Sequence, residues 1–252
     1  MQPKNSELFD FLEEKYFQYN RTEFIESDPI QVPHLFQRRE DIEIAAFLSA
    51  TIAWGQRTTI IANAKKLLTF MDNSPFDFVS NATEEDLAPF EQFKHRTFNG
   101  IDAVFFIQSL QHIYRNGGLE ACFSPGSSAE ASISGFKRQF FSIPHPARTT
   151  KHVADPLKGS SAKRINMFLR WMVRSDKQGI DFGLWKSIPS SRLMLPLDVH
   201  TGNVARKLGL LVRNQNDWKA VEEVTSALRQ FDASDPVKYD FALFGLGAFE
   251  KF

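Results

Sequence analysis

The chain has 252 residues, of which 42% are apolar and 24% charged, which is the composition of a globular protein with a sizeable core. Thirty Lys and Arg balance thirty Asp and Glu, and the single Cys excludes both an internal disulfide and a cysteine-bound iron–sulfur or zinc site. No apolar run approaches the roughly 20 residues of a membrane span and the first residues lack a signal-peptide pattern, so we expect a cytoplasmic protein with no membrane partner.

Helical periodicity dominates the sequence, and no convincing run of alternating strand residues appears. The pattern predicts helices at residues 6–19, 39–53, 58–71, 83–90, 101–116, 129–141, 160–174, 198–208, 217–230 and 236–249. Asp217 is placed to cap the helix that follows it, and Asp235 with Pro236 supplies a second cap and a first-turn proline. We therefore predict an all-α protein, a two-lobed helical bundle.

We expect residues 1–252 to form a single two-lobed unit. Residues 38–185 would make a central helical lobe that contains the basic helix, and residues 1–37 and 196–252 a second helical lobe. An irregular connector, rich in Gly and Pro, would join the basic helix to the helix at 198–208.

Positive charge is concentrated in one part of this neutral chain. Residues 137–177 contain ten Lys or Arg against two acids, an excess of eight, so the remainder carries an excess of eight negative charges. Such a segment can present a phosphate-binding face, although a solvated basic helix and loop would have the same composition.

The predicted helix at 160–174 places its cations on one side. On a helical wheel Lys163, Arg170 and Arg174 share a face, and the opposite face is apolar. The preceding residues 158–161 (KGSS) are small or basic, and free backbone N–H groups at a helix start suit a phosphate oxygen. The helix is thus a candidate nucleic-acid contact.

Asp198 lies in the most informative stretch of the chain, residues 195–210, and opens an amphipathic helix just after Pro196. An N-cap role alone would explain it. The helix dipole also favours the ionised carboxylate, which can stabilise a developing positive charge. With Lys163 upstream as an amine nucleophile, the two residues would suffice for attack on a sugar C1′ carbon.

Three segments resemble the helix-hairpin-helix DNA glycosylase superfamily. Residues 196–200 (PLDVH) are similar to the family's catalytic Asp element, in the form found in 8-oxoguanine glycosylases. Residues 44–50 (IAAFLSA), followed by 54–59 (WGQRTT), resemble its early helix and Q-x-T loop, and residues 241–248 (FALFGLGA) resemble its closing helix. The segments occur in the family's order and cover the chain from about residue 40 to its end.

One family element differs. The hairpin pattern L-P-G-V-G-x-K-T-A is absent upstream of Asp198, and its nearest equivalent is residues 158–164 (KGSSAKR). The longer spacing from lysine to Asp resembles the archaeal 8-oxoguanine glycosylase branch and an uncharacterised bacterial family with the pattern K-R-x-N-M-F-L-R-W-M-V-R.

The resemblance implies base-excision repair of double-stranded DNA, with an oxidised purine as the favoured lesion. The damaged nucleotide would be flipped out of the duplex, Asp198 would stabilise the oxocarbenium-like sugar, and Lys163 would add to C1′ and allow β-elimination. Phosphate contacts would come from Lys151, Lys158, Gly159, Ser160, Arg164, Arg170, Arg174 and His200. The base pocket, or the gap left in the stack, would be filled by Trp54, Gln56 and Arg57, with a core aromatic as the alternative for Trp54.

Two other functions remain open at this point. One is a non-catalytic nucleic-acid-binding protein on the same fold, and the other is an enzyme whose Lys163 forms a Schiff base with a small carbonyl compound. We expect a monomer without a metal site or cofactor, and the resemblance leaves open a cation held by backbone carbonyls of the hairpin. Cys122, in an apolar context, is interpreted as a buried helix end.

Overall fold

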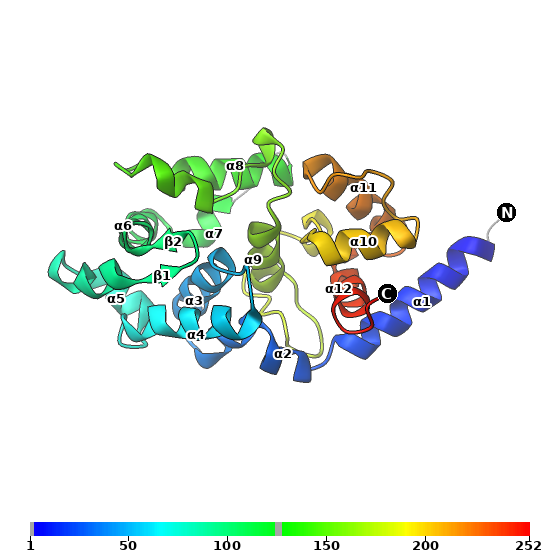
Figure 1. Cartoon of the computed structure of the whole chain (residues 1–252), viewed down its shortest axis with the longest axis horizontal. Helices are drawn as coiled ribbons and strands as arrows, with labels where there is room; N and C mark the ends of the chain where they lie inside the picture. Colours follow the sequence, from blue (N-terminus) through cyan, green and yellow to red (C-terminus); the bar gives the residue numbers. More distant parts are fainter. Residues whose placement is uncertain (1–2, 124–127) are drawn as a thin grey trace. The chain divides into compact units, whose positions relative to one another are not determined.

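The structure, a computed structural model, describes residues 3–123 and 128–252. Within these ranges the regular secondary structure is helical apart from one two-stranded antiparallel sheet (Figure 1), which confirms the all-α prediction. Two compact units divide the chain: unit 1 comprises Met1–Phe24 and Asp155–Phe252, and unit 2 comprises Ile25–Ala154. None of the helices in the described ranges has the length and apolar character of a membrane span.

Unit 2 is a helical body whose core is built largely from phenylalanine. Its elements are η1 (Pro29–Gln31), η2 (Pro33–Leu35), α3 (Arg39–Thr51), α4 (Arg57–Thr69), α5 (Pro75–Asn81), η3 (Glu85–Gln92), β1 (Lys94–His95), β2 (Phe98–Asn99), α6 (Gly100–Arg115), α7 (Gly118–Phe123), α8 (Ala129–Phe140) and η4 (Ala147–His152). The ring of Phe47 on α3 lies 5.9 Å from Phe106 on α6 and 5.5 Å from Phe136 on α8. All three rings are fully buried, so they join three helices that are distant in sequence.

The start of helix α6 is defined by a capping box and by the close approach of its first residue to η3. Asn99 and Asp102 form a capping box, in which each side chain accepts a hydrogen bond from the other's backbone N–H. Gly100 leaves no room for a side chain, since a Cβ there would lie 2.0 Å from the carbonyl oxygen of Glu91. The short hairpin β1–β2 is therefore held directly against the start of α6.

Unit 1 contains α1 (Pro3–Tyr19), η5 (Pro156–Lys158), α9 (Lys163–Val173), η6 (Ser190–Arg192), α10 (Val199–Lys207), α11 (Trp218–Arg229), η7 (Pro236–Tyr239) and α12 (Asp240–Ala248). The short helix α2 (Glu23–Ser27) spans the junction between the units. Helices α1 and α12 pack closely at Gly245, where a Cβ would lie 2.1 Å from the ring of Tyr19.

The structure differs from the sequence prediction at several elements. The segment predicted as a helix at 83–90 is the 3-10 helix η3 with Pro89 inside it, and the helix predicted at 236–249 is divided into η7 and α12. The hairpin at 94–99 was not predicted, because strands of two residues show no alternation.

The division into units also differs from the expected lobes. Residues 155–185, which contain α9, belong to the same unit as Asp198 rather than to the central body. The reason is a set of buried ion pairs that tie α9 to the loops and helices following it.

Candidate active site

Lys163 and Asp198 are in contact within unit 1. The Nζ atom of Lys163 lies 3.2 Å from Oδ2 of Asp198, and the two side chains remain 34% and 17% exposed. An amine and a carboxylate thus meet at a position that solvent still reaches. The prediction that these two residues converge agrees with this geometry, although they come from one unit and not from two lobes.

Hydrogen bonds hold both the side chain and the backbone of Asp198. Its Oδ1 atom accepts a hydrogen bond of 2.9 Å from the backbone N–H of Thr201, which caps α10. Its backbone carbonyl accepts from the side-chain amide of Asn216 at 3.1 Å. The preceding residues 193–197 are all buried, and the N–H of Leu195 donates to the hydroxyl of Thr225. These contacts fix the carboxylate, and Oδ2 alone is left to face Lys163.

The charge state of Asp198 follows from its surroundings. Partial burial raises the pKa of this carboxyl, but the Lys163 ammonium, the N–H of Thr201 and the charge of His200 outweigh that effect and hold the pKa below its usual 3.8. Asp198 is therefore ionised at neutral pH, as a group that stabilises a cationic sugar must be. The helix cap and the charged role coexist in one side chain.

Lys163 is positioned by the turn that precedes α9. Gly159 and Ala162 both have positive φ, 83° and 47°. The carbonyl of Gly159 accepts from the N–H of Trp218, and Ser160 forms an isolated bridge with Asp217 at the start of α11. The turn is thus fixed against α11, and Lys163, the first residue of α9, projects from a rigid base.

This turn corrects the prediction that Gly159 and Ser160 offer free backbone N–H groups to a phosphate. The N–H of Gly159 donates to the carbonyl of Pro156 at 2.7 Å, and that of Ser160 donates to Asp155 at 3.3 Å. Both donors are used inside the turn, since a 3-10 turn satisfies its own amides. Lys158, by contrast, is exposed at the surface.

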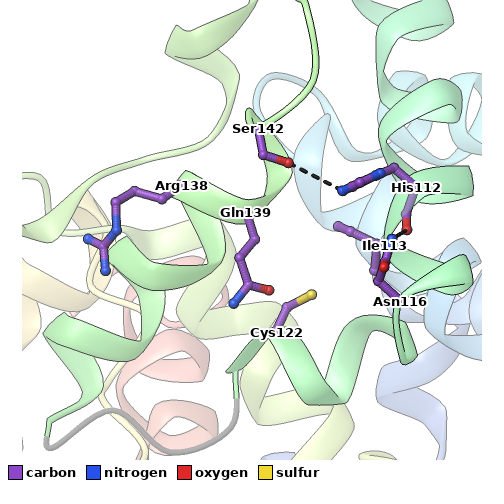
Figure 2. A pocket seen from close by; sticks show the side chains of 7 residues that line it. All are labelled: His112, Ile113, Asn116, Cys122, Arg138, Gln139 and Ser142. Atoms are coloured by element: carbon purple, nitrogen blue, oxygen red, sulfur yellow. Dashed lines mark hydrogen bonds between the residues drawn. The ribbon is translucent and has the colours of Figure 1, made fainter.

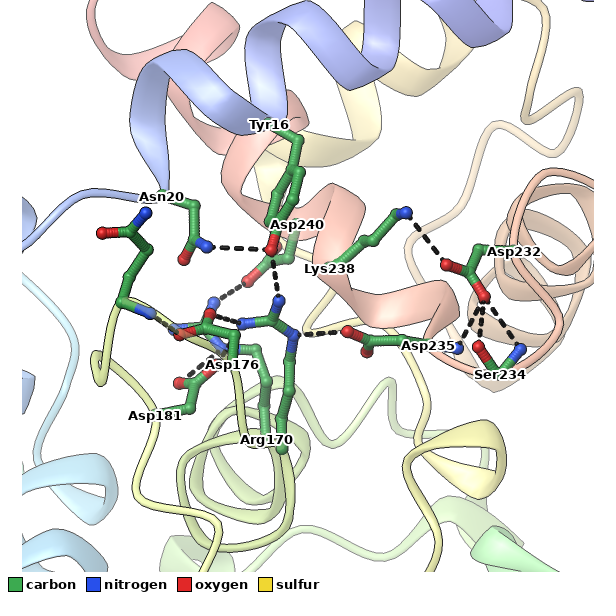
Figure 3. A network of polar contacts seen from close by, with 12 residues as sticks. Tyr16, Asn20, Arg170, Asp176, Asp181, Asp232, Ser234, Asp235, Lys238 and Asp240 are labelled. Atoms are coloured by element: carbon green, nitrogen blue, oxygen red, sulfur yellow. Dashed lines mark hydrogen bonds and ion pairs between the residues drawn. The ribbon is translucent and has the colours of Figure 1, made fainter.

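Arg170 and Arg174 are also placed differently from the prediction. Their side chains are only 4% and 1% exposed, and both are held by carboxylates, so neither can reach a DNA phosphate. Figure 3 shows Arg170 between Asp181 and Asp240. The wheel correctly placed both cations on one face of α9, but that face points into the unit and not to solvent.

Arg174 makes more contacts in this network than Arg170 does. Its Nη1 atom lies 3.0 Å from Asp181 and 2.6 Å from Asp176, and its Nε atom lies 2.8 Å from Asp235. Its Nη2 atom donates to the hydroxyl of Tyr16 on α1 at 2.9 Å. Asp235 was interpreted from the sequence as a helix cap, yet its side chain makes no capping bond and faces Arg174 instead.

Asp240 is a residue of this site that the sequence did not reveal. It begins α12 and pairs with Arg170. Burial raises its pKa to about 6; Arg170 and Lys163 oppose this rise, and the charge of Asp198 adds to it. Asp240 therefore lies within electrostatic reach of the Lys163–Asp198 pair. No sequence signal marks it, because it falls inside the helix predicted at 236–249 and is far along the chain from Arg170.

The remaining predicted contacts of unit 1 are Arg164 and His200. Arg164 is partly buried, and burial lowers the pKa of its guanidinium to about 10. His200 is exposed, two residues after Asp198 on α10. Apart from the buried Arg170 and Arg174, the predicted residues of unit 1 are all at least partly exposed: Lys158, Gly159, Ser160, Lys163, Arg164, Asp198 and His200.

The other predicted residues belong to unit 2. Trp54 is partly buried, with its ring 5.1 Å from that of His95 and 6.1 Å from that of His152. Gln56 is exposed at the N-cap position of α4, and Arg57 is the first residue of that helix. Lys151 is exposed near the end of η4. These residues therefore lie on surface segments, which is compatible with ligand contact.

Unit 2 also contains a cavity of about 330 Å³ that none of the predicted residues lines. Figure 2 shows His112 and Ser142 at its wall, joined by a hydrogen bond of 3.3 Å, with Cys122 below them. Burial raises the pKa of the Cys122 thiol to about 11, so that thiol is a poor nucleophile at neutral pH. Among residues 3–123 and 128–252 no group of three or more His, Cys, Asp or Glu could hold a metal ion.

Comparison with known proteins gives one match. Residues 28–249 match the model of a family described as a protein of unknown function, DUF2400. No curated protein and no solved structure matches the chain. The family description names no activity, so the resemblance to the glycosylases stays a prediction.

Proposed function

The chain belongs to the DUF2400 family, and we propose that it is a helix-hairpin-helix DNA glycosylase with lyase activity that removes a damaged base from double-stranded DNA. The observation that carries the proposal is the 3.2 Å contact between Nζ of Lys163 and Oδ2 of Asp198, with both side chains partly open to solvent. An oxidised purine is the favoured lesion, on the resemblance of residues 196–200 alone.

The first chemical step is cleavage of the bond between C1′ and the base. The bonding electron pair leaves with the base, which takes a proton from the Lys163 ammonium. The positive charge that develops on the sugar lies beside the carboxylate of Asp198, which its surroundings keep ionised. A fixed opposite charge of this kind stabilises the transition state more than the ground state.

The second step uses the amine that the first step has freed. Nζ of Lys163 bonds to C1′, and the bond from C1′ to the ring oxygen breaks as one nitrogen proton moves to that oxygen. The product is an iminium between enzyme and open-chain sugar. Loss of a proton from C2′ then expels the 3′ phosphate, which is β-elimination.

Local geometry supports this assignment of roles. Lys163 projects from a turn fixed against α11, and Asp198 is held by Thr201 and Asn216. The two side chains are therefore preorganised, and the reaction requires little movement of either one. A surface ion pair that has no catalytic function does not require hydrogen bonds that position both of its side chains.

Borohydride trapping tests the proposal directly. The whole protein is incubated with duplexes that carry different lesions or an abasic site, and the iminium is reduced to a stable adduct. We expect an adduct that is lost in Lys163→Ala and kept in Lys219→Ala, a matched change at an exposed lysine of the same unit that has no role in the proposed site.

Two outcomes would assign another function. Trapping by free aldehydes or ketones but by no DNA would indicate a small-molecule Schiff-base enzyme. Salt-sensitive DNA binding without any adduct would indicate a non-catalytic binding protein. An adduct that persists in Lys163→Ala would show that a different amine reacts.

A further inference from the structure

A second group of cations lies in unit 2, where three segments distant in sequence meet. We name it the hairpin patch and define it by Lys94, Arg96, Arg148 and Lys151. The segments are residues 54–57, the hairpin at 94–99, and η4 at 147–152. None of these segments contains an acidic residue.

Specific contacts hold the first two segments together. The ring Nε2 of His95 donates to the backbone carbonyl of Trp54 at 3.1 Å. Gly55, with φ of 112°, lies under the next residue of the hairpin, because a Cβ there would be 3.3 Å from Nη1 of Arg96. The tip of the hairpin thus rests on the loop that begins at Trp54.

The third segment is tied to the hairpin at both of its ends. Arg148 donates to the backbone carbonyl of Thr97 at 3.0 Å and to the side chain of Asn99 at 2.5 Å. At the other end, the ring of His152 packs against that of Phe98 with centroids 5.0 Å apart. Lys151 directly precedes this histidine, so it stands beside the hairpin.

The charge of the patch is poorly balanced by its surroundings. Among the described residues, the carboxylate in an ion pair with the patch is that of Asp102, which is fully buried and lies 2.7 Å from Nη1 of Arg148. Lys94, Arg96 and Lys151 are exposed. Three cations therefore face solvent beside one guanidinium whose charge is already paired, which is an arrangement suited to a polyanion.

Arg96 occupies a position that a long side chain does not favour. Its φ is 53°, in the left-handed region, and it is the first residue of the two-residue turn between paired Lys94–Asn99 and His95–Phe98. Gly, Asn or Asp is typical there because residues with bulky side chains are strained at positive φ. Residues held in such conformations cluster at functional sites, so the observation favours a role for this guanidinium beyond folding.

We propose that the hairpin patch binds the phosphodiester backbone of DNA, with Arg96, Lys94 and Lys151 as phosphate contacts and Arg148 as the residue that holds the hairpin in place. The inference extends the proposed function, since it gives that function a binding surface, but it requires no chemistry at Lys163. Its test can therefore be separated from the trapping experiment.

The experiment measures binding of a fluorescently labelled, undamaged DNA duplex by the whole protein over a series of salt concentrations. The patch variant combines Lys94→Ala, Arg96→Gly and Lys151→Ala; Arg148 is kept because it neutralises buried Asp102. The control variant removes three other exposed cations of unit 2 and has the same net charge: Lys65→Ala, Lys66→Ala and Arg115→Ala.

For the patch variant we expect Kd to rise by roughly 30- to 100-fold and the slope of log Kd against log salt to fall by roughly 3, about one for each phosphate that the variant no longer neutralises. The control should stay within about twofold of the wild type. The single variant Arg96→Gly should weaken binding without lowering the thermal midpoint, since Gly adopts positive φ freely. That result distinguishes removal of a phosphate-binding group from damage to the fold.

Equal weakening in the patch and control variants, or none in the patch variant, would overturn the inference. If the wild type forms a Schiff base with a lesion duplex while the patch variant binds normally, the inference fails and the proposed function stands. If binding depends on the patch but no lesion gives an adduct, the proposed function fails and the inference stands.

Discussion

Replacing Asp198 by Asn separates the two roles of this side chain, because Asn caps a helix as well as Asp does but carries no charge. The Asn side-chain oxygen can still accept the hydrogen bond from the N–H of Thr201, now 2.9 Å long. What the variant loses is the negative charge 3.2 Å from Nζ of Lys163. Replacement by Ala removes the cap as well, so the pair of variants isolates each contribution.

The effect of Asp198→Asn on stability is expected to be small. Two unit charges at that distance attract by about 5 kcal/mol at an effective dielectric constant of about 20. Solvent reaches both side chains, and the desolvation and ordering of such pairs cancel most of this attraction, leaving about 0.2–1 kcal/mol. For Asp198→Ala the lost cap adds about 0.5–2 kcal/mol. Urea unfolding should therefore rank the wild type and Asp198→Asn close together, with Asp198→Ala below both.

The effect on chemistry is expected to be much larger. One preorganised group that stabilises developing charge contributes roughly 3 kcal/mol to a transition state, about a hundredfold in rate. Single-turnover release of the base should therefore slow by about that factor in Asp198→Asn, with DNA binding retained. Equal rates in wild type and Asp198→Asn, together with loss of stability in Asp198→Ala, would show that Asp198 is only a helix cap.

The same variant gives a pH signature. The pKa of Asp198 is lower in the folded protein than its ordinary value, so its ionised form stabilises the fold fully above the unfolded value, about 4. This contribution is lost as the pH falls through the folded pKa. The unfolding free energy of Asp198→Asn should lack that acid-dependent part, which a comparison of denaturation at neutral and acidic pH would detect.

Four further predictions concern the surrounding structure. Asp240 has a folded pKa of about 6 against an ordinary 3.8, so the stability of the wild type relative to Asp240→Asn should fall by about 3 kcal/mol as the pH rises through that range, measured by urea unfolding. Arg174→Met should lose about 3–5 kcal/mol in the same assay, because it leaves buried carboxylates without their partner. Gly245→Ala should lose about 1–3 kcal/mol, since its methyl group would meet the ring of Tyr19, and the thermal midpoint should drop accordingly. Cys122 should react with iodoacetamide at pH 8 about a hundredfold more slowly than a free cysteine, because its thiol is almost wholly protonated there.

The sequence predicted the helical elements well wherever a long apolar period was present. The segment predicted at 39–53 is α3, and the segments predicted at 101–116 and 217–230 are α6 and α11, each shifted by a residue or two at its ends. Asp217 caps α11 as predicted, with its side chain accepting from the N–H of Ala220. Local rules suffice for these elements because a helix is defined by neighbours in sequence.

The same rules could not show what the cationic face of α9 meets. A helical wheel places Arg170 and Arg174 together, but it does not show which carboxylates meet them. Asp235 and Asp240 are distant in sequence, and Asp181 lies in an irregular loop whose path a wheel does not predict. The excess positive charge of residues 137–177 therefore indicated that Arg170 and Arg174 would be exposed. In the structure both side chains are buried in a network of ion pairs. The hairpin at 94–99 escaped prediction for the opposite reason, since it is too short to show any pattern.

The balance of charge around α9 bears on where DNA can bind. Three cations pair with five carboxylates here: Lys163 and Arg170 of α9, together with Arg174 directly after it, contact Asp176, Asp181, Asp198, Asp235 and Asp240. With all of them ionised the group carries two negative charges in excess, which repels phosphate. An enzyme that performs C1′ chemistry beside such a cluster needs its phosphate contacts elsewhere on the chain. Under the proposed function, the exposed Lys94, Arg96 and Lys151 of the hairpin patch are the candidates for those contacts.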